Sequence, residues 1–186
     1  WPRIAAIDFG WDHPTAVVWC AINTEEEIFY VYDCYRASKA SPSVHSAVIR
    51  TRPHFIPIAY PHDGNRRDSM GNPGLADQYR NMGCNFLLEH FTNPPALGSN
   101  KGSNSIEEGL MAMLQSVEAG KFKVFSTLSD WFEEFRMYHR KDNKVVPLRD
   151  DLMSATRYAF QSQRFAVAGE DPTWTQDVEY RNYGII

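Results

Sequence analysis

Apolar residues in the first part of the chain fall into three short runs separated by polar turns. The first run covers residues 3–9 and the second covers residues 14–22, and residues 10–14 between them carry the glycine, aspartate and proline typical of a turn. A third run over residues 27–35 alternates between two sets of side chains. We therefore expect three antiparallel strands joined as a meander.

Farther along, helical periodicity alternates with short apolar runs. Helices are expected from Pro42 onward and over residues 75–82, 106–119, 128–138 and 151–163, and short strands over residues 55–60, 86–88 and 121–125. The capping box of Ser105 and Glu108 marks one helix start, and we expect the apolar stripe behind it to be buried. This order predicts an α/β fold with a mixed β-sheet, in which the antiparallel meander is joined by parallel strands and flanked by helices.

The length and composition fit one globular domain. The chain has 186 residues, of which 43% are apolar and 13% aromatic. Because the helical pattern decays beyond residue 163, we expect a domain over residues 1–163 and a C-terminal tail over residues 164–186 that is a candidate docking segment. The start at Trp1 predicts a piece of a longer protein that is not secreted. No apolar run approaches the roughly 20 residues of a membrane helix.

Charge and cysteine content narrow the function classes further. The formal net charge of −4 argues against a large sequence-independent DNA-binding surface, because such affinity comes mainly from neutralised phosphates. If DNA is the substrate, we expect this chain to bind it weakly by itself. The three cysteines show no Cys-x-x-Cys spacing, so neither a disulfide framework nor a zinc ribbon is indicated, and a reducing cytoplasm is expected.

Acidic residues stand at the ends of three predicted elements. Asp8 closes the first strand, Asp63 follows the strand over residues 55–60, and Asp150 and Asp151 open the last long helix. Carboxylates delivered to one edge of a sheet are hard ligands for Mg²⁺ or Mn²⁺. Two such ions can stabilise the attacking and leaving oxygens of a displacement at phosphorus. The pattern therefore predicts a metal-dependent nuclease.

Each acid also has a purely structural interpretation. Asp8 and Asp63 can shape turns by bonding to their own backbone. Asp150 or Asp151 can cap the helix that follows, because aspartate is favoured at that position and at the positive end of the helix dipole. A cap and a ligand can coexist when two acids are adjacent, and we favour Asp151 as the ligand.

Three motifs resemble those of a known family. Residues 6–16 (Ala-Ile-Asp-Phe-Gly-Trp-Asp-His-Pro-Thr-Ala) are similar to the opening motif of the nuclease domain of tailed-phage large terminase subunits of the headful packaging type. Residues 61–64 (Pro-His-Asp-Gly) resemble the second motif, and residues 150–159 (Asp-Asp-Leu-Met-Ser-Ala-Thr-Arg-Tyr-Ala) resemble the third. The order of elements resembles the ribonuclease H-like fold to which those domains belong.

The resemblance implies a metal-dependent DNA endonuclease that cuts concatemeric viral DNA during genome packaging by two-metal-ion hydrolysis. It implies Asp8, Asp63 and Asp151 as catalytic residues, and these three with Asp150 as ligands of two divalent cations, Mg²⁺ or Mn²⁺. Several relatives carry an acid where this chain has Ser154, which leaves the choice between Asp150 and Asp151 open.

The same resemblance implies several partners. They are double-stranded DNA, an upstream ATPase domain of the same polypeptide, the small terminase subunit and the portal protein, with no membrane partner. The expected location is the host cytoplasm, at the capsid portal during assembly. The chain has no phosphate loop of the ATPase type, which agrees with a nuclease piece.

Several further residues are candidates for supporting roles. Asp12 and His62 are candidates to contact the metal ligands rather than the metal itself, although either can be an ordinary turn or surface residue. Basic residues that could contact the DNA backbone lie near two of the acids. They are Arg66, Arg67, Arg140, Lys141, Lys144 and Arg149.

Three alternatives remain open at the level of sequence. A resolvase or transposase nuclease of the same fold would differ in substrate rather than chemistry. A catalytically silent module that docks to DNA or the portal would use its acids only as caps and turns. The segment Asp8 to Thr15 also resembles the phosphate loop of sugar-kinase and chaperone-type ATPases, but the second lobe and second phosphate loop of that class are missing.

Overall fold

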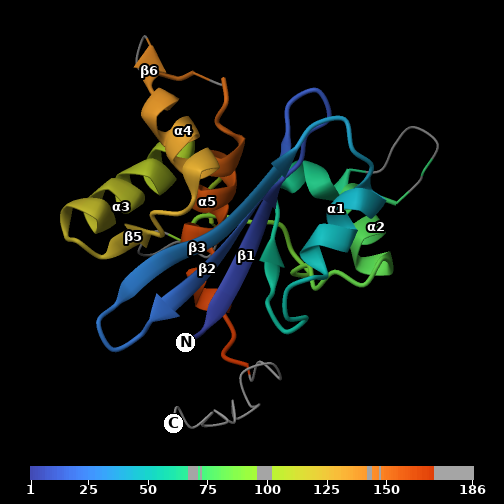
Figure 1. Cartoon of the computed structure of the whole chain (residues 1–186), viewed down its shortest axis with the longest axis horizontal. Coiled ribbons are helices and arrows are strands. Elements are labelled where there is room, and N and C mark those ends of the chain that lie inside the picture. The colour runs from blue at the N-terminus through green and yellow to red at the C-terminus, as the bar shows by residue number, and fades with distance from the viewer. Residues whose placement is uncertain (67–70, 72, 96–101, 142–143, 147, 170–186) are drawn as a thin grey trace, which may run out of the picture.

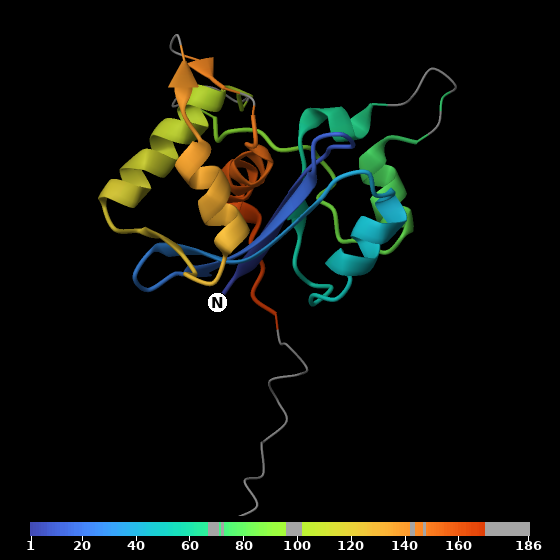
Figure 2. The same ribbon diagram turned by 45° about the horizontal axis from the view of Figure 1, so that its top comes forward.

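The structure is a computed structural model that describes residues 1–66, 71, 73–95, 102–141, 144–146 and 148–169, with no side chain described for Lys144. A five-stranded sheet separates two helical layers (Figure 1). Figure 2 shows the same two layers after a rotation. In the described part of the chain, no helix is long and apolar enough to cross a membrane.

The sheet confirms the predicted mixed topology. Strands β1 (Arg3–Asp8), β2 (Thr15–Asn23) and β3 (Ile28–Ala37) form the antiparallel meander. Strand β4 (Ile58–Ala59) pairs in parallel with β1, and β5 (Phe122–Val124) pairs in parallel with β3. The order across the sheet is β4-β1-β2-β3-β5, so β1 lies beside both an antiparallel and a parallel neighbour.

Each face of the sheet has its own hydrophobic core, as the alternation of side chains along a strand requires. Ile4 and Ala6 of β1 face the layer of α3 (Ile106–Glu118), α4 (Ser129–Met137) and α5 (Asp151–Gln161). Ala5 and Ile7 face the layer of α1 (Pro42–Ile49) and α2 (Leu75–Asn81). All four side chains are fully buried.

Helix α5 is the central helix of its layer. It packs across β1 and β2, and ten of its eleven residues are buried. This position explains why the sequence of α5 is apolar on more than one side.

Two predicted strands are shorter than expected. Residues 55–60 form only the two-residue β4, because Pro57 and Pro61 lie on its two sides and proline has no N–H to donate to a neighbouring strand. The Pro57 carbonyl still accepts the Ala5 N–H at 2.8 Å. Residues 86–88 contribute a single parallel bridge, between Ile58 and Phe86. The prediction of a full strand over residues 86–88 is therefore wrong.

Helix α3 begins at the predicted capping box, with the Ser105 hydroxyl accepting the Glu108 N–H at 3.4 Å. Its apolar stripe is not buried as predicted. Leu114 and Val117 are about half exposed, at 48% and 46%. They line an open apolar groove of about 430 Å³ between α3 and α4, so α3 lies on the rim of the core rather than inside it.

The chain beyond α5 returns to the sheet. A 3₁₀ turn, η2 (Gln163–Phe165), follows α5, and Val167 pairs with Arg3 through N···O distances of 2.9 and 3.0 Å. The boundary at residue 163 remains a prediction. The rest of the predicted docking tail lies outside the described residues.

Candidate metal centre

Asp8 and Asp63 meet at one edge of the sheet. Asp8 is the last residue of β1, and Asp63 lies in the 3₁₀ turn η1 (His62–Asn65) that follows the neighbouring parallel strand β4. Parallel neighbours end at the same edge of a sheet, which is where open α/β sheets place their ligands. The predicted convergence of these two strand ends is confirmed by the pairing of β1 with β4.

A glycine allows η1 to lie close to the sheet. A Cβ atom at Gly64 would stand 2.7 Å from ring carbons of both Phe9 and Tyr60. Because that distance is shorter than any ordinary contact, a side chain at position 64 would push η1 outward. Gly64 therefore fixes how near the adjacent Asp63 comes to Asp8.

Helix α5 brings the remaining acids to the same edge. Asp151 is its first residue and is 7% exposed, whereas Asp150 precedes it and is half-buried. Burial raises the pKa of Asp8, and the Tyr158 hydroxyl, two turns farther along α5, opposes that rise. Helix α5 thus contacts β1 and reaches the end of that strand.

The pKa of Asp8 responds to the other three carboxyl groups. Burial, followed by the charges of Asp151, Asp63 and Asp150, raises the pKa of Asp8 from 3.8 to about 8, against the opposing effect of the Tyr158 hydroxyl. Burial also raises the pKa of Asp151, with Asp150 as the next cause. Carboxylates that repel one another in this way form a region of strong negative potential.

The capping of α5 is not performed by its own aspartates. Asp150 occupies the N-cap position but makes no side-chain cap hydrogen bond. Instead, the fully buried Glu134 of α4 accepts the N–H of Leu152 at 2.7 Å, and its other oxygen pairs with Arg36 at 3.0 Å. The prediction that the side chain of Asp150 or Asp151 caps this helix is wrong, since Asp150 holds the N-cap position without such a bond and its carboxylate is free of that role.

The four acids form an open cluster. In the part of the chain that the structure describes, no group of three or more His, Cys, Asp or Glu side chains has an arrangement that could hold a metal ion directly. The carboxylates of Asp151, Asp63 and Asp150 are thus near enough to add to the raised pKa of Asp8, but the four do not surround one point. All the donors are carboxylate oxygens, the ligands that Mg²⁺ and Mn²⁺ prefer, so the chemistry of the donor set fits such a cation.

The two residues predicted to support the metal ligands, Asp12 and His62, lie in different surroundings. Asp12 lines a hollow of about 350 Å³ together with His13 and Asp151, so it lies beside the cluster. His62 is exposed in η1, next to Asp63. Burial raises the pKa of both Asp150 and Asp151, and His13, a residue not singled out from the sequence, opposes that rise.

The basic residues predicted to contact DNA differ in whether they already form ion pairs. Arg140 pairs with Glu107 at 2.6 Å, and Arg149 pairs with Glu133 at 3.0 Å. Arg66 directly follows η1 and is exposed, and Lys141 is exposed in the short hairpin of β6 (Arg140–Lys141) and β7 (Lys144–Val145). Arg67 and the Lys144 side chain lie outside the described residues.

Two further residues of the site were missed from the sequence. Tyr158 falls seven residues after Asp151, a spacing of two helical turns that places both on one face of α5 and that could have identified it. No pattern in the sequence indicated Glu134, because its contact with Leu152 joins two helices whose packing the sequence does not specify.

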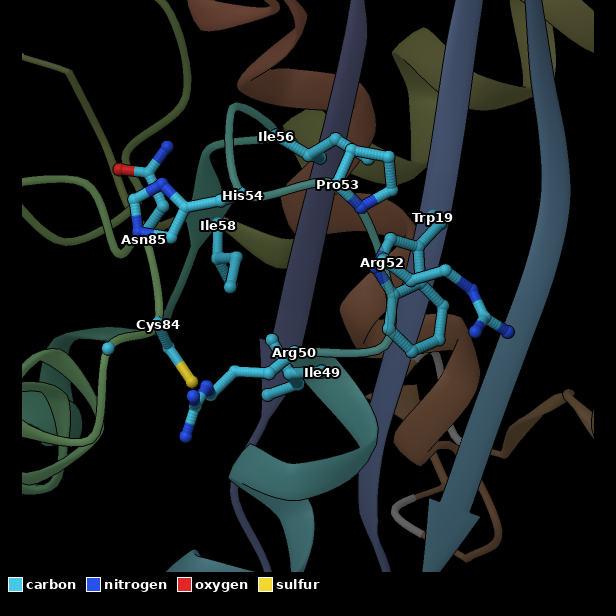
Figure 3. A pocket seen from close by; sticks show the side chains of 11 residues that line it. Trp19, Ile49, Arg50, Arg52, Pro53, His54, Ile56, Ile58, Cys84 and Asn85 are labelled. Carbon is cyan, nitrogen blue, oxygen red and sulfur yellow. The ribbon is translucent and has the colours of Figure 1, made fainter. Parts of the chain in front are cut away.

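A separate cavity of about 250 Å³, which none of the four acids lines, lies near the beginning of β4 (Figure 3). Trp19, Arg50, Arg52, His54 and Cys84 are among the side chains that surround it. Its lining contains no carboxylate, so it does not compete with the acidic cluster as a cation site.

Comparisons with known proteins agree with this architecture. The model of the terminase RNase H-like domain family matches residues 5–163. The large terminase subunit of Salmonella phage P22 is 36% identical over 164 residues, which are 88% of this chain and 32% of that protein. The chain thus spans about a third of the length of the curated relatives it matches.

Solved structures show the same fold. The P22 large terminase nuclease domain superposes with a TM-score of 0.78 at 35% identity, covering 89% of this chain and 82% of that one. The nuclease domain of the SPP1 large terminase, solved with bound Mn, has a TM-score of 0.57 at 17% identity, covering 87% of this chain and 85% of that one. With its mixed sheet, its acid-bearing edge and a family match over residues 5–163, the chain belongs to the terminase RNase H-like domain family.

Proposed function

We propose that this domain is a metal-dependent DNA endonuclease that cuts concatemeric viral DNA during genome packaging. One observation carries the proposal most directly: the Asp8 carboxyl lies among three other carboxyl groups, whose charges together with burial raise its pKa to about 8. Such a group of acids is costly to fold unless a cation offsets its charge. Family membership and the P22 nuclease-domain structure support the same activity.

Asp8, Asp63 and Asp151 would hold two divalent cations, Mg²⁺ or Mn²⁺, with Asp150 as a further ligand. Bound there, such ions supply an activated water at neutral pH and stabilisation of charge on the leaving oxygen. The Mn bound to the SPP1 nuclease domain supports this choice of metal.

The protein's own contribution is to position these groups. Glu134 holds the first turn of α5 so that Asp151 stays at the sheet edge. Asp63 is exposed and therefore accessible to a phosphodiester arriving from solvent. The exposed Arg66, just beyond η1, is placed to contact the DNA backbone without reading sequence.

The intact protein would supply what this domain lacks. The P22 relative is about three times as long as the matched segment, and we propose an upstream ATPase domain in the same polypeptide. With a net charge of −4, the nuclease domain would bind DNA weakly alone and depend on that motor, the small subunit and the portal to present it. The site of action would be the capsid portal in the host cytoplasm.

Plasmid cleavage tests the proposal. The chain is incubated with supercoiled plasmid and Mn²⁺ or Mg²⁺, and compared with Asp8→Asn, Asp63→Asn and the control Asp77→Asn, which removes an exposed carboxylate that pairs with Arg80 on α2. We expect nicking by the parent and the control, at least 100-fold less by the two site variants, and none with EDTA. Unchanged cleavage by a folded Asp8→Asn or Asp63→Asn variant would remove that residue from the site.

A further inference from the structure

A second cavity, of about 300 Å³, shares Asp63 with the acidic cluster. It lies between the loop after β1 and the beginnings of α1 and α2. Besides Asp63, the side chains that matter for its chemistry are those of Phe9, Trp11, His45, Leu75 and Tyr79. The cavity is therefore an aromatic and apolar hollow directly beside the carboxylates.

Trp11 stands at this cavity with 59% of its surface exposed, on a loop whose backbone is held in place. The Thr15 hydroxyl accepts the Gly10 N–H at 3.2 Å and donates to the Gly10 carbonyl at 2.9 Å. The Trp11 carbonyl accepts the Lys39 N–H at 2.8 Å. An exposed indole on a fixed loop is a preformed stacking surface, since little conformational entropy is lost when a second ring lies against it.

Two polar side chains of the cavity wall, His45 and Thr15, are already hydrogen-bonded. His45 is 2% exposed; its Nδ1 lies 3.1 Å from the Tyr35 hydroxyl, and its Nε2 lies 3.1 Å from the Ala40 carbonyl. Because a carbonyl only accepts, Nε2 carries the proton and Nδ1 accepts from Tyr35. With the Thr15 hydroxyl also engaged, the wall favours a flat ring over a sugar or a phosphate.

Two exposed cations lie close in the chain to residues that line the cavity. Lys39 is exposed next to the Trp11 loop, and Arg66 is exposed beyond Asp63. Within the described residues, neither side chain has an ion pair or hydrogen bond, in contrast to Arg140 and Arg149, which are paired with glutamates. Unpaired cations near an aromatic hollow suit a single strand, with charges for the phosphates and a ring for a base.

We propose that this cavity binds one unpaired nucleobase of the DNA strand that lies across Asp8 and Asp63, with Trp11 stacked on the base. The inference rests on the proposed nuclease function and adds to it a preference for unpaired DNA. A base must leave the duplex to enter, at a cost of a few kcal/mol that is smallest where the DNA is already unpaired. The domain would therefore favour single-stranded or locally opened DNA.

Binding of an oligonucleotide that contains 2-aminopurine tests the inference. The full chain carries Asp8→Asn to prevent cleavage, and its affinity for a single strand and for the matching duplex is read from 2-aminopurine fluorescence and anisotropy. Base stacking on an aromatic side chain contributes about 1–3 kcal/mol, so adding Trp11→Ala should weaken single-strand binding by roughly 5- to 150-fold. Trp11→Phe should retain most of the affinity.

A matched control is available in Trp1, which is 63% exposed and stacks on Tyr30 away from the site. Trp1→Ala should leave single-strand binding unchanged, and Trp11→Ala should have a smaller effect on the duplex than on the single strand. Equal affinities of the parent and Trp11→Ala, equal losses in Trp1→Ala and Trp11→Ala, or no binding of the single strand by the parent would each overturn the inference.

The inference and the nuclease proposal can fail separately. If the unsubstituted chain nicks plasmid with Mn²⁺ while Trp11→Ala binds the single strand as the parent does, only the base-binding cavity is refuted. If single-strand binding depends on Trp11 but the unsubstituted chain does not nick plasmid, the cavity is supported and the nuclease function is refuted.

Discussion

Glu134 accepts the backbone N–H of Leu152 at 2.7 Å and so caps a helix to which it does not belong. Its second oxygen pairs with Arg36 on β3, so one buried carboxylate joins α4, the sheet and the start of α5. Through this contact the two aspartates at the start of α5 are released from capping. The negative charge needed at the helix N-terminus comes from α4, and the carboxylates of α5 remain available to the site.

Removing the Glu134 carboxylate should therefore damage both stability and the site. Glu134→Ala leaves Arg36 without its buried partner and Leu152 without its acceptor, and we expect a loss of about 3–5 kcal/mol in the free energy of unfolding, measured in urea. Glu134→Gln keeps an acceptor for Leu152 and should cost less. If both variants unfold at the parental urea concentration, the capping role is wrong.

Asp8 should make the metal-free fold less stable as the pH rises. Its pKa is about 8 in the folded state and 3.8 without that environment, so the folded state holds the proton more tightly. For a raised carboxyl pKa, stability is greatest below about pH 4 and is lost as the pH rises towards 8.

Asp8→Asn removes this penalty. In EDTA at pH 8, we expect it to be more stable than the parent by about 1–3 kcal/mol after allowance for screening by solvent, with a difference that shrinks towards pH 4. Thermal melts at several pH values measure this. A variant that is less stable than the parent at pH 8 would contradict the crowding of carboxylates around Asp8.

Gly64→Ala should displace η1. The added Cβ would stand 2.7 Å from the rings of Phe9 and Tyr60, so the turn must shift or the rings must move. We expect a stability loss of about 1–3 kcal/mol and weaker Mn²⁺ binding, because Asp63 moves with the turn. Ala76→Gly on α2 is the control, because it reports the effect of a backbone change of similar size elsewhere in the fold. Gly120→Ala is unsuitable as a control, because Gly120 has a φ of 70°. Titration calorimetry with Mn²⁺ that gives parental affinity for Gly64→Ala would contradict the role assigned to this glycine.

The free and paired arginines should differ in their effect on DNA binding. Arg66→Ala removes an unpaired cation beside Asp63 and should weaken duplex binding and reduce the slope of log affinity against log salt by about 1. Arg149→Ala removes a cation that pairs with Glu133 at 3.0 Å and should change that slope by less. Fluorescence anisotropy in an Asp8→Asn background, over a series of salt concentrations, compares them; a larger effect of Arg149 would reverse the assignment.

The sequence predicted the scaffold of the site better than its supporting contacts. Asp8 and Asp63 could be placed because a strand end is a local property and two parallel neighbours end at one edge. The rim position of α3 could not, because an apolar stripe shows that a face avoids water but not how completely another element covers it. The Glu134–Leu152 contact depends on the packing of two helices, which no spacing in the sequence encodes.

Anomalous diffraction from a crystal soaked in Mn²⁺ would test most directly whether the distant acids form one metal site. We expect manganese peaks coordinated by Asp8, Asp63 and Asp151, with the Asp150 carboxylate within reach and α5 still capped by Glu134. Manganese bound only elsewhere, or no bound manganese in crystals that retain this fold, would contradict the assignment of these residues as metal ligands.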